Sequence, residues 1–100
     1  MRWLEIISVE AAGPKQKEKI VELFNKIRAP QSAILNVYRD ILGNELSIHI
    51  QWNSQSAPQG GRSPLGRELC CTVSEHGLVA HALWVEGNQS KLNGPPDYTN

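Results

Sequence analysis

Leu46-Ser47-Ile48-His49-Ile50-Gln51-Trp52 decides the fold class of this chain, because apolar and polar residues alternate along residues 46–52. Alternation with a period of two places every second side chain on the same face of a β-strand. The even-numbered residues are apolar and require a core, whereas Ser47, His49 and Gln51 present hydrogen-bonding groups on the opposite face. The function depends on what that second face contacts.

Three further strands and two helices are predicted from the rest of the chain. The strands cover residues 2–10, 32–40 and 78–86, which are rich in β-branched and aromatic residues. One helix covers residues 14–28 and begins with Pro14, and the other begins at Pro64 after Ser63 as N-cap. His76-Gly77 is predicted to end the second helix with a left-handed glycine. Residues 42–45 are predicted to form a hairpin turn, and residues 53–62 a loop.

The element order strand, helix, strand, strand, helix, strand consists of two split βαβ halves. This order predicts an α+β, ferredoxin-like βαββαβ domain over residues 1–86, a four-stranded antiparallel sheet with both helices on one face. The expected spatial order of the strands is fourth, first, third, second. Residues 87–100 have little apolar content and are predicted to form a disordered C-terminal tail.

Composition restricts the functional class. The 100 residues carry ten basic and ten acidic side chains, so the basic excess of a nucleic-acid-binding protein is absent. No apolar run approaches the roughly 20 residues needed to cross a bilayer, and no secretory signal is expected. The adjacent Cys70 and Cys71 are poorly placed for a mutual disulfide and are interpreted as buried small hydrophobes, which favours the reducing cytoplasm.

Strand patterning also predicts a second copy of the chain as partner. In the strands 2–10 and 78–86 the odd-numbered and even-numbered residues lie on opposite faces, and both sets are largely apolar. Two helices cover only one face of such a sheet. A monomer would expose a larger apolar patch than monomers in water usually do, so a homodimer joined through the open sheet face is expected.

Polar residues on the predicted sheet form the candidate site. Ser47, His49 and Gln51 on the third strand are expected to lie beside Asn36 and Tyr38 on the second, and these side chains, together with Arg62, are candidate ligand-binding groups.

The candidate catalytic residues are His49, His81 and Glu5, which the expected strand order places on three adjacent strands about 5 Å apart. Two imidazoles beside a carboxylate can transfer a proton near neutral pH, with Glu5 fixing the tautomer of one ring.

Structural interpretations compete with each of these assignments. His49 and His81 as neutral residues in a dimer interface, with Glu5 paired to an arginine, would explain the same pattern. A His-His-Glu metal centre lacks close ligand spacing on any element, so no metal is predicted. Arg62 and the helix start that follows would suit an anion, but a plain loop with an N-cap explains them as well. Trp52 and Trp84 are interpreted as core residues.

The strand at 46–52 and the segment Gly-Leu-Val-Ala-His-Ala-Leu-Trp-Val-Glu at 77–86 resemble those of the dimeric α/β-barrel superfamily. This superfamily includes antibiotic-biosynthesis-type monooxygenases and stress-responsive A/B-barrel proteins, and the resemblance, which extends to small bacterial members, covers residues 1–86 in element order and length. It implies two sheets that face each other around a cavity. It does not specify a reaction, because this fold supports many functions.

Two functional hypotheses follow, and a third ranks behind them. The chain is a monooxygenase-like homodimer that binds or transforms a small apolar organic molecule between its sheets, with no bound cofactor. Alternatively, it is a structural or regulatory homodimer without catalytic activity, so whether it is an enzyme stays open. An RNA-recognition module shares the element order, but the neutral charge and the polar third strand disfavour it.

Overall fold

Six elements follow one another along the chain in the predicted order. The computed structural model describes residues 2–53 and 62–85, so most of the predicted 53–62 loop and the predicted 87–100 tail lie outside the described residues. The strands and helices are β1 (Trp3–Ala11), α1 (Pro14–Asn25), β2 (Ala33–Arg39), β3 (Glu45–Trp52), α2 (Pro64–Ser74) and β4 (Gly77–Val85).

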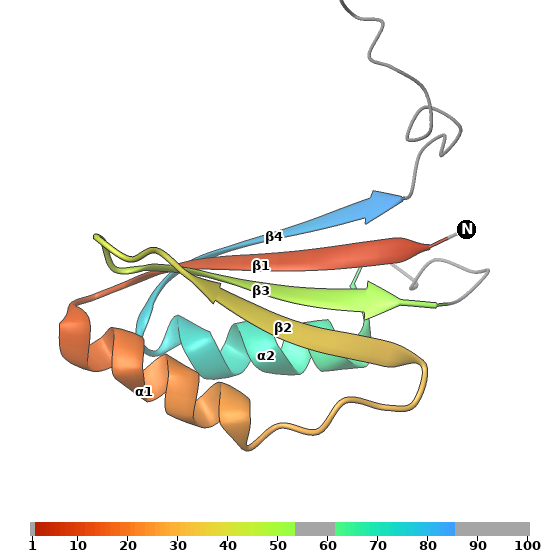
Figure 1. Ribbon diagram of the computed structural model, residues 1–100, viewed down its shortest axis with the longest axis horizontal. Helices are drawn as coiled ribbons and strands as arrows, with labels where there is room; N and C mark the ends of the chain where they lie inside the picture. The colour runs from red at the N-terminus through yellow and green to blue at the C-terminus, as the bar shows by residue number, and fades with distance from the viewer. Residues whose placement is uncertain (1, 54–61, 86–100) are drawn as a thin grey trace, which may run out of the picture.

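The four strands form an antiparallel sheet in the order β2-β3-β1-β4, which is the predicted order. Both helices lie against the same side of this sheet, and neither reaches the other side (Figure 1). The ferredoxin-like α+β fold is therefore confirmed. We call the two sides of the sheet the covered face and the open face.

Burial in β3 follows the alternation of apolar and polar residues in 46–52. Its even-numbered residues up to Ile50 are buried, and Trp52 packs against the same core. The buried hydrophobic residues come from the covered face and from both helices: Ile7, Val9, Ala11, Ile20, Ala33, Leu46, Ile48, Ile50, Leu69 and Val73. Removing such side chains from water supplies most of the stability of a small domain, at roughly 25 cal/mol per Å² of apolar surface.

The helix starts agree with the sequence, but the predicted helix ends do not, since α1 ends at Asn25 and not at Arg28. Pro14 occupies the first turn of α1, and the Ser63 hydroxyl accepts a hydrogen bond from the Gly66 N–H at 2.8 Å to cap α2. Gly77, however, is the first residue of β4 and has no left-handed backbone. A side chain at Gly77 would collide with the backbone of Glu10, so close packing of β4 on β1 explains this glycine.

The cysteine interpretation holds for only one of the two thiols. Both cysteines are free; Cys70 is half-buried against the core, whereas Cys71 is exposed on α2. Adjacent helical residues point about 100° apart, so a helix lying on a sheet can bury only one of the two. Within residues 2–53 and 62–85, no helix is long and apolar enough to cross a membrane.

Candidate functional site

The predicted catalytic trio is divided between the two faces of the sheet. β1 pairs Ile6 with His49 on one side, and it pairs Ile7 with His81 on the other. Consecutive residues of a strand point to opposite faces, so His49 lies on the open face and His81 on the covered face. Glu5 shares the covered face with His81. The prediction that all three side chains meet is wrong, and the three cannot hold one metal ion.

Glu5 is 0% exposed and is the centre of a buried polar cluster. Its Oε1 accepts a hydrogen bond from the Trp52 indole N–H at 2.6 Å. Its Oε2 accepts the Ser63 backbone N–H at 3.1 Å and lies 2.8 Å from Nε2 of His81. These groups belong to β1, β3, β4 and the start of α2. The carboxylate therefore connects three strands to one helix, and no arginine takes part in the contacts described.

The electrostatics of this cluster favour the ionised carboxylate. Burial alone raises the pKa of Glu5, but hydrogen bonds from Ser63, Trp52 and His81 outweigh burial and hold that pKa below its ordinary value. The first turn of α2 adds the positive end of a helix dipole. Glu5 therefore remains charged at neutral pH, and its lone pairs are occupied by donors within the protein.

Arg62 lies apart from the other candidate ligand-binding residues. It precedes Ser63 at the start of α2, where its charge opposes the burial that raises the pKa of the Cys70 thiol. Of the two interpretations of this helix start, the N-cap is present in Ser63, and the Ser63 N–H is taken by the Glu5 carboxylate of the chain itself. That carboxylate lies so close to the helix that a side chain on Gly66 would collide with it. A glycine is needed here so that the helix can approach the carboxylate this closely.

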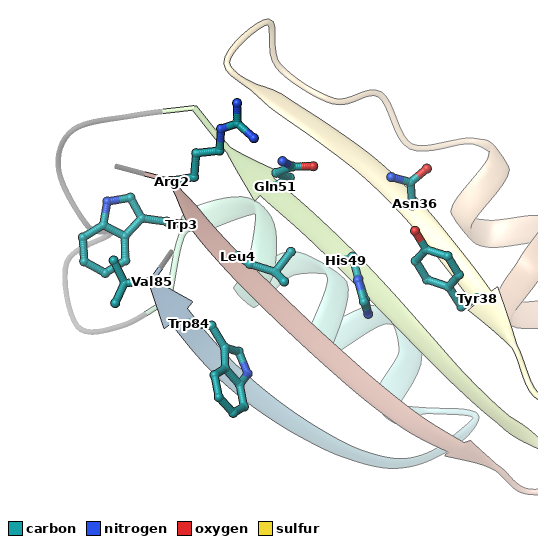
Figure 2. Close-up of a pocket in the computed structure, with 9 residues that line it drawn as sticks. All are labelled: Arg2, Trp3, Leu4, Asn36, Tyr38, His49, Gln51, Trp84 and Val85. Carbon is teal, nitrogen blue, oxygen red and sulfur yellow. The ribbon is translucent and has the colours of Figure 1, made fainter. Parts of the chain in front are cut away.

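The open face carries a hollow of about 330 Å³ at the end where β1 begins and β4 ends (Figure 2). Its polar side chains come from β2, from β3 and from Arg2 just before β1, and its apolar ones from β1 and β4. The hollow is lined by Arg2, Trp3, Leu4, Asn36, Tyr38, His49, Gln51, Trp84 and Val85. Its volume falls within the range of small-molecule sites, and a polar margin beside an apolar floor suits an organic ligand with one polar edge.

His49 lies beside Tyr38 within this hollow, as Figure 2 shows. The two ring centroids are 4.7 Å apart and the ring planes are inclined by 55°. Nε2 of His49 lies 2.9 Å from the Ser47 hydroxyl, the next residue on the same face of β3. Ser47 therefore fixes the orientation of the ring, and Nδ1 is the nitrogen that remains for a ligand. An imidazole held in this way can donate a hydrogen bond to a ligand or accept one from it, depending on its tautomer.

Five predicted residues are brought together and three are not. Asn36 is the register partner of His49, and Tyr38 that of Ser47, so the polar group expected from β2 and β3 is present on the open face together with Gln51. Glu5, His81 and Arg62 lie elsewhere.

The tryptophans divide in the same way as the histidines. Trp52 packs on the core as expected, with its N–H on Glu5. Trp84 is 60% exposed and lines the hollow, so its interpretation as a core residue is wrong. The alternation of β4 already indicates that Trp84 lies on the open face, because it places Trp84 on the face opposite His81. Arg2 and Leu4 also line the hollow, and only the register with Gln51 and Trp84 places Leu4 there.

The fold places this chain among the ferredoxin-like α+β proteins, with the hollow on the open face of the sheet. No protein-family model matches the sequence, and no match is found among curated proteins. Solved structures do match. The resemblance to antibiotic-biosynthesis-type monooxygenases is confirmed at the level of the fold.

One match is a monooxygenase from the gene ActVA-Orf6 of Streptomyces coelicolor, solved in complex with the ligand nanaomycin D. It superposes with a TM-score of 0.64 at 19% identity, over 86% of this chain and 88% of that one. Another is Rv0793 from Mycobacterium tuberculosis, with a TM-score of 0.58 at 18% identity, over 88% of this chain and 98% of that one. At these identities the likeness concerns the fold.

Proposed function

We propose that this protein binds a small, largely apolar organic molecule on the open face of its sheet, over Leu4 and Trp84, and assists proton transfer through His49. The observation that carries this proposal is the hollow of about 330 Å³, in which polar groups line one side and apolar groups the other. A monooxygenase of the same fold is described in complex with an organic ligand, nanaomycin D, and this supports the choice of ligand class.

A second copy of the chain completes the site in this proposal. Exposed large hydrophobic residues on the open face include Ile34, Leu78 and Trp84, and water is a poor environment for so many of them. Two open faces packed together bury these residues and close the hollow from above. Excluding water in this way strengthens the hydrogen bonds and charge interactions of His49 with a ligand.

The chemistry that the chain itself offers in the hollow is acid–base chemistry. His49 can accept a proton from a ligand at Nδ1, while Ser47 retains the Nε2 side of the ring. The Tyr38 hydroxyl and the Asn36 amide can orient a polar edge of the ligand, and the Trp84 ring offers a face on which a planar molecule stacks.

The test is a thermal-shift screen of small aromatic compounds, including nanaomycin D, against the wild type, Trp84→Ala and His49→Gln. A compound that binds only the folded protein raises its melting temperature. We expect compounds that stabilise the wild type and have little effect on Trp84→Ala. Thr72→Ala, on α2 and therefore on the helix side of the sheet, is the control and should respond like the wild type. The proposal fails if no compound binds, or if Trp84→Ala responds as strongly as the wild type.

A structural or regulatory homodimer is the alternative, and the apolar character of the open face is the observation that favours it. In that case the side chains of the second copy fill the hollow. The two functions differ in one measurable respect, since a filled hollow gives a stable dimer with no thermal response to any compound.

A further inference from the structure

The turn between β2 and β3 carries two adjacent aliphatic side chains in nearly full exposure. Ile41 is 91% exposed and Leu42 is 96% exposed. Tight turns usually contain glycine, proline, asparagine, aspartate or serine, because these residues adopt or stabilise the backbone conformations of a turn. We call residues 40–44 the hairpin tip. A pair of large apolar residues at a projecting tip has no role in the core of its own chain.

The backbone of the hairpin tip is held in place by α1. Nζ of Lys17 donates to the carbonyl oxygens of Asp40 at 2.6 Å and of Gly43 at 2.7 Å. The Asp40 carboxylate also accepts the Leu42 N–H at 3.1 Å. A surface segment that is ordered before it meets a partner loses less conformational entropy on binding. The two apolar side chains are therefore presented on a prepared support.

The same end of the sheet has a hollow of about 220 Å³ on the open face between β1 and β4. Leu78, which is 76% exposed, and Ala80 supply its apolar wall, and Ser8, Glu10 and Glu45 line its polar side. The hollow is adjacent to the hairpin tip, because Glu45, which directly follows the tip, also lines the hollow. Glu10 of β1 pairs with both Glu45 and Leu78, and β4 begins at the same end of the sheet as the β2–β3 turn (Figure 1). This hollow is smaller than the roughly 300 Å³ at which small-molecule sites begin, and its size suits aliphatic side chains.

We propose that the hairpin tip of one copy inserts Ile41 and Leu42 into the hollow beside Leu78 of a second copy, and that the second copy does the same in return. β2 and β4 are the two edge strands, so a twofold axis along the strands places β2 of one copy over β4 of the other. The contact is then isologous and closed. This inference rests on the sheet-to-sheet dimer of the proposed function and adds a separate contact at its end.

The charges around the hairpin tip favour a protein partner over a lipid surface. Arg39 is paired with Glu18 at 3.2 Å, and Lys17 is occupied by backbone carbonyls. Asp40 and Glu45 add negative charge at the tip itself. Apolar loops that insert into anionic membranes carry a basic surplus, and the charged side chains around this tip have none.

Sedimentation equilibrium tests the inference on the wild type, the double variant Ile41→Ser/Leu42→Ser, and Leu78→Ser. Both tip side chains are exposed, so the variants should keep the wild-type circular dichroism spectrum. We expect the tip variant to raise the dimer dissociation constant by about 100-fold or more, because each lost apolar contact occurs twice in a symmetric dimer. Asn44→Ser, which leaves the apolar pair intact, is the matched control and should dimerise like the wild type.

A double-mutant cycle tests the pairing itself. If the side chains touch, Leu42→Ala and Leu78→Ala together should weaken the dimer by clearly less than the product of their separate effects, since either change alone removes the shared contact. Effects that multiply in full would contradict the pairing.

The remaining outcomes separate this inference from the proposed function. A wild type that dimerises while the tip variant dimerises equally well overturns the inference and leaves the sheet-to-sheet dimer intact. A wild type that is monomeric up to millimolar concentration overturns both. Wild type that sediments with phosphatidylcholine–phosphatidylserine vesicles, when the tip variant does not, overturns the inference by assigning the tip to a bilayer.

Discussion

The two faces of the sheet contain the same kinds of residues and use them in opposite ways. On the covered face, Glu5, His81 and Trp52 satisfy one another at distances of 2.6–2.8 Å. On the open face, His49 and Tyr38 line a hollow that can admit a ligand. A titratable residue is a functional candidate when its partners leave a hydrogen-bonding position for something else, and a structural one when they do not. Four changes test this contrast, beginning with the largest expected effect.

Replacing Glu5 by glutamine should cost the most stability. The amide keeps the size of the carboxylate, but its NH2 group faces one of the buried donors. That donor then has no acceptor. We expect a loss of about 3 kcal/mol in the free energy of unfolding, measured by urea denaturation. Glu18→Gln makes the same chemical change in an exposed ion pair with Arg39 and should cost less than about 1 kcal/mol. Equal urea midpoints for the two variants would contradict the structural role of Glu5.

Gly66→Ala should act on the same cluster from the helix side. A methyl group at this position would collide with the Glu5 carboxylate, so either the carboxylate or α2 must move. We expect a loss of about 1–3 kcal/mol in unfolding free energy. Glycine to alanine inside an uncrowded helix instead stabilises by about 1 kcal/mol. The sign of the change therefore decides whether helix and carboxylate are in the close contact described.

Acid should weaken the protein through Glu5. The pKa of Glu5 in the folded chain lies below its ordinary value of 4.5, so the unfolded chain binds the proton first as the pH falls. The stabilisation by Glu5 is complete above about pH 4.5 and is lost as the pH falls through the lower, folded pKa. Urea midpoints measured from pH 6 to pH 3 should fall more steeply for the wild type than for Glu5→Gln. Parallel curves would show that Glu5 does not carry this dependence.

His49→Gln should change stability the least. The ring lies on the open face and is hydrogen-bonded to Ser47, so we expect a change within about 1 kcal/mol in the free energy of unfolding at fixed protein concentration. Affinity for a compound identified by thermal shift should nevertheless fall by about tenfold or more, as expected when a buried polar contact is lost. Calorimetric titration measures this, and unchanged affinity together with lowered stability would place His49 among the structural residues.

The sequence was sufficient for the fold because its periodicities are local. Alternation in residues 46–52 predicted which side of β3 is buried, and the element order predicted the strand order. The position of His49 away from the core followed from the same alternation. Its neighbours Asn36 and Tyr38 followed from the pattern of residues 32–40 and the predicted hairpin.

The grouping of Glu5 and His81 with His49 failed because it depends on register. A shift of one residue along β1, from Ile7 to Ile6, separates the partner of His81 from the partner of His49. The contact between Glu5 and the Ser63 N–H joins residues 58 positions apart and has no local signal in the sequence. Polar side chains on a strand therefore predict a site only when the pairing of that strand with its neighbours is known.

The three histidines of the chain allow the most direct test of the division between the faces. Their ring resonances, assigned with single His→Gln variants, can be followed by NMR while a compound from the thermal-shift screen is added. We expect the His49 ring signals to move until the site is saturated, while those of His81, enclosed with Glu5, stay in place. Movement of the His81 signals without those of His49 would contradict this expectation, because the ligand would then lie on the helix side of the sheet.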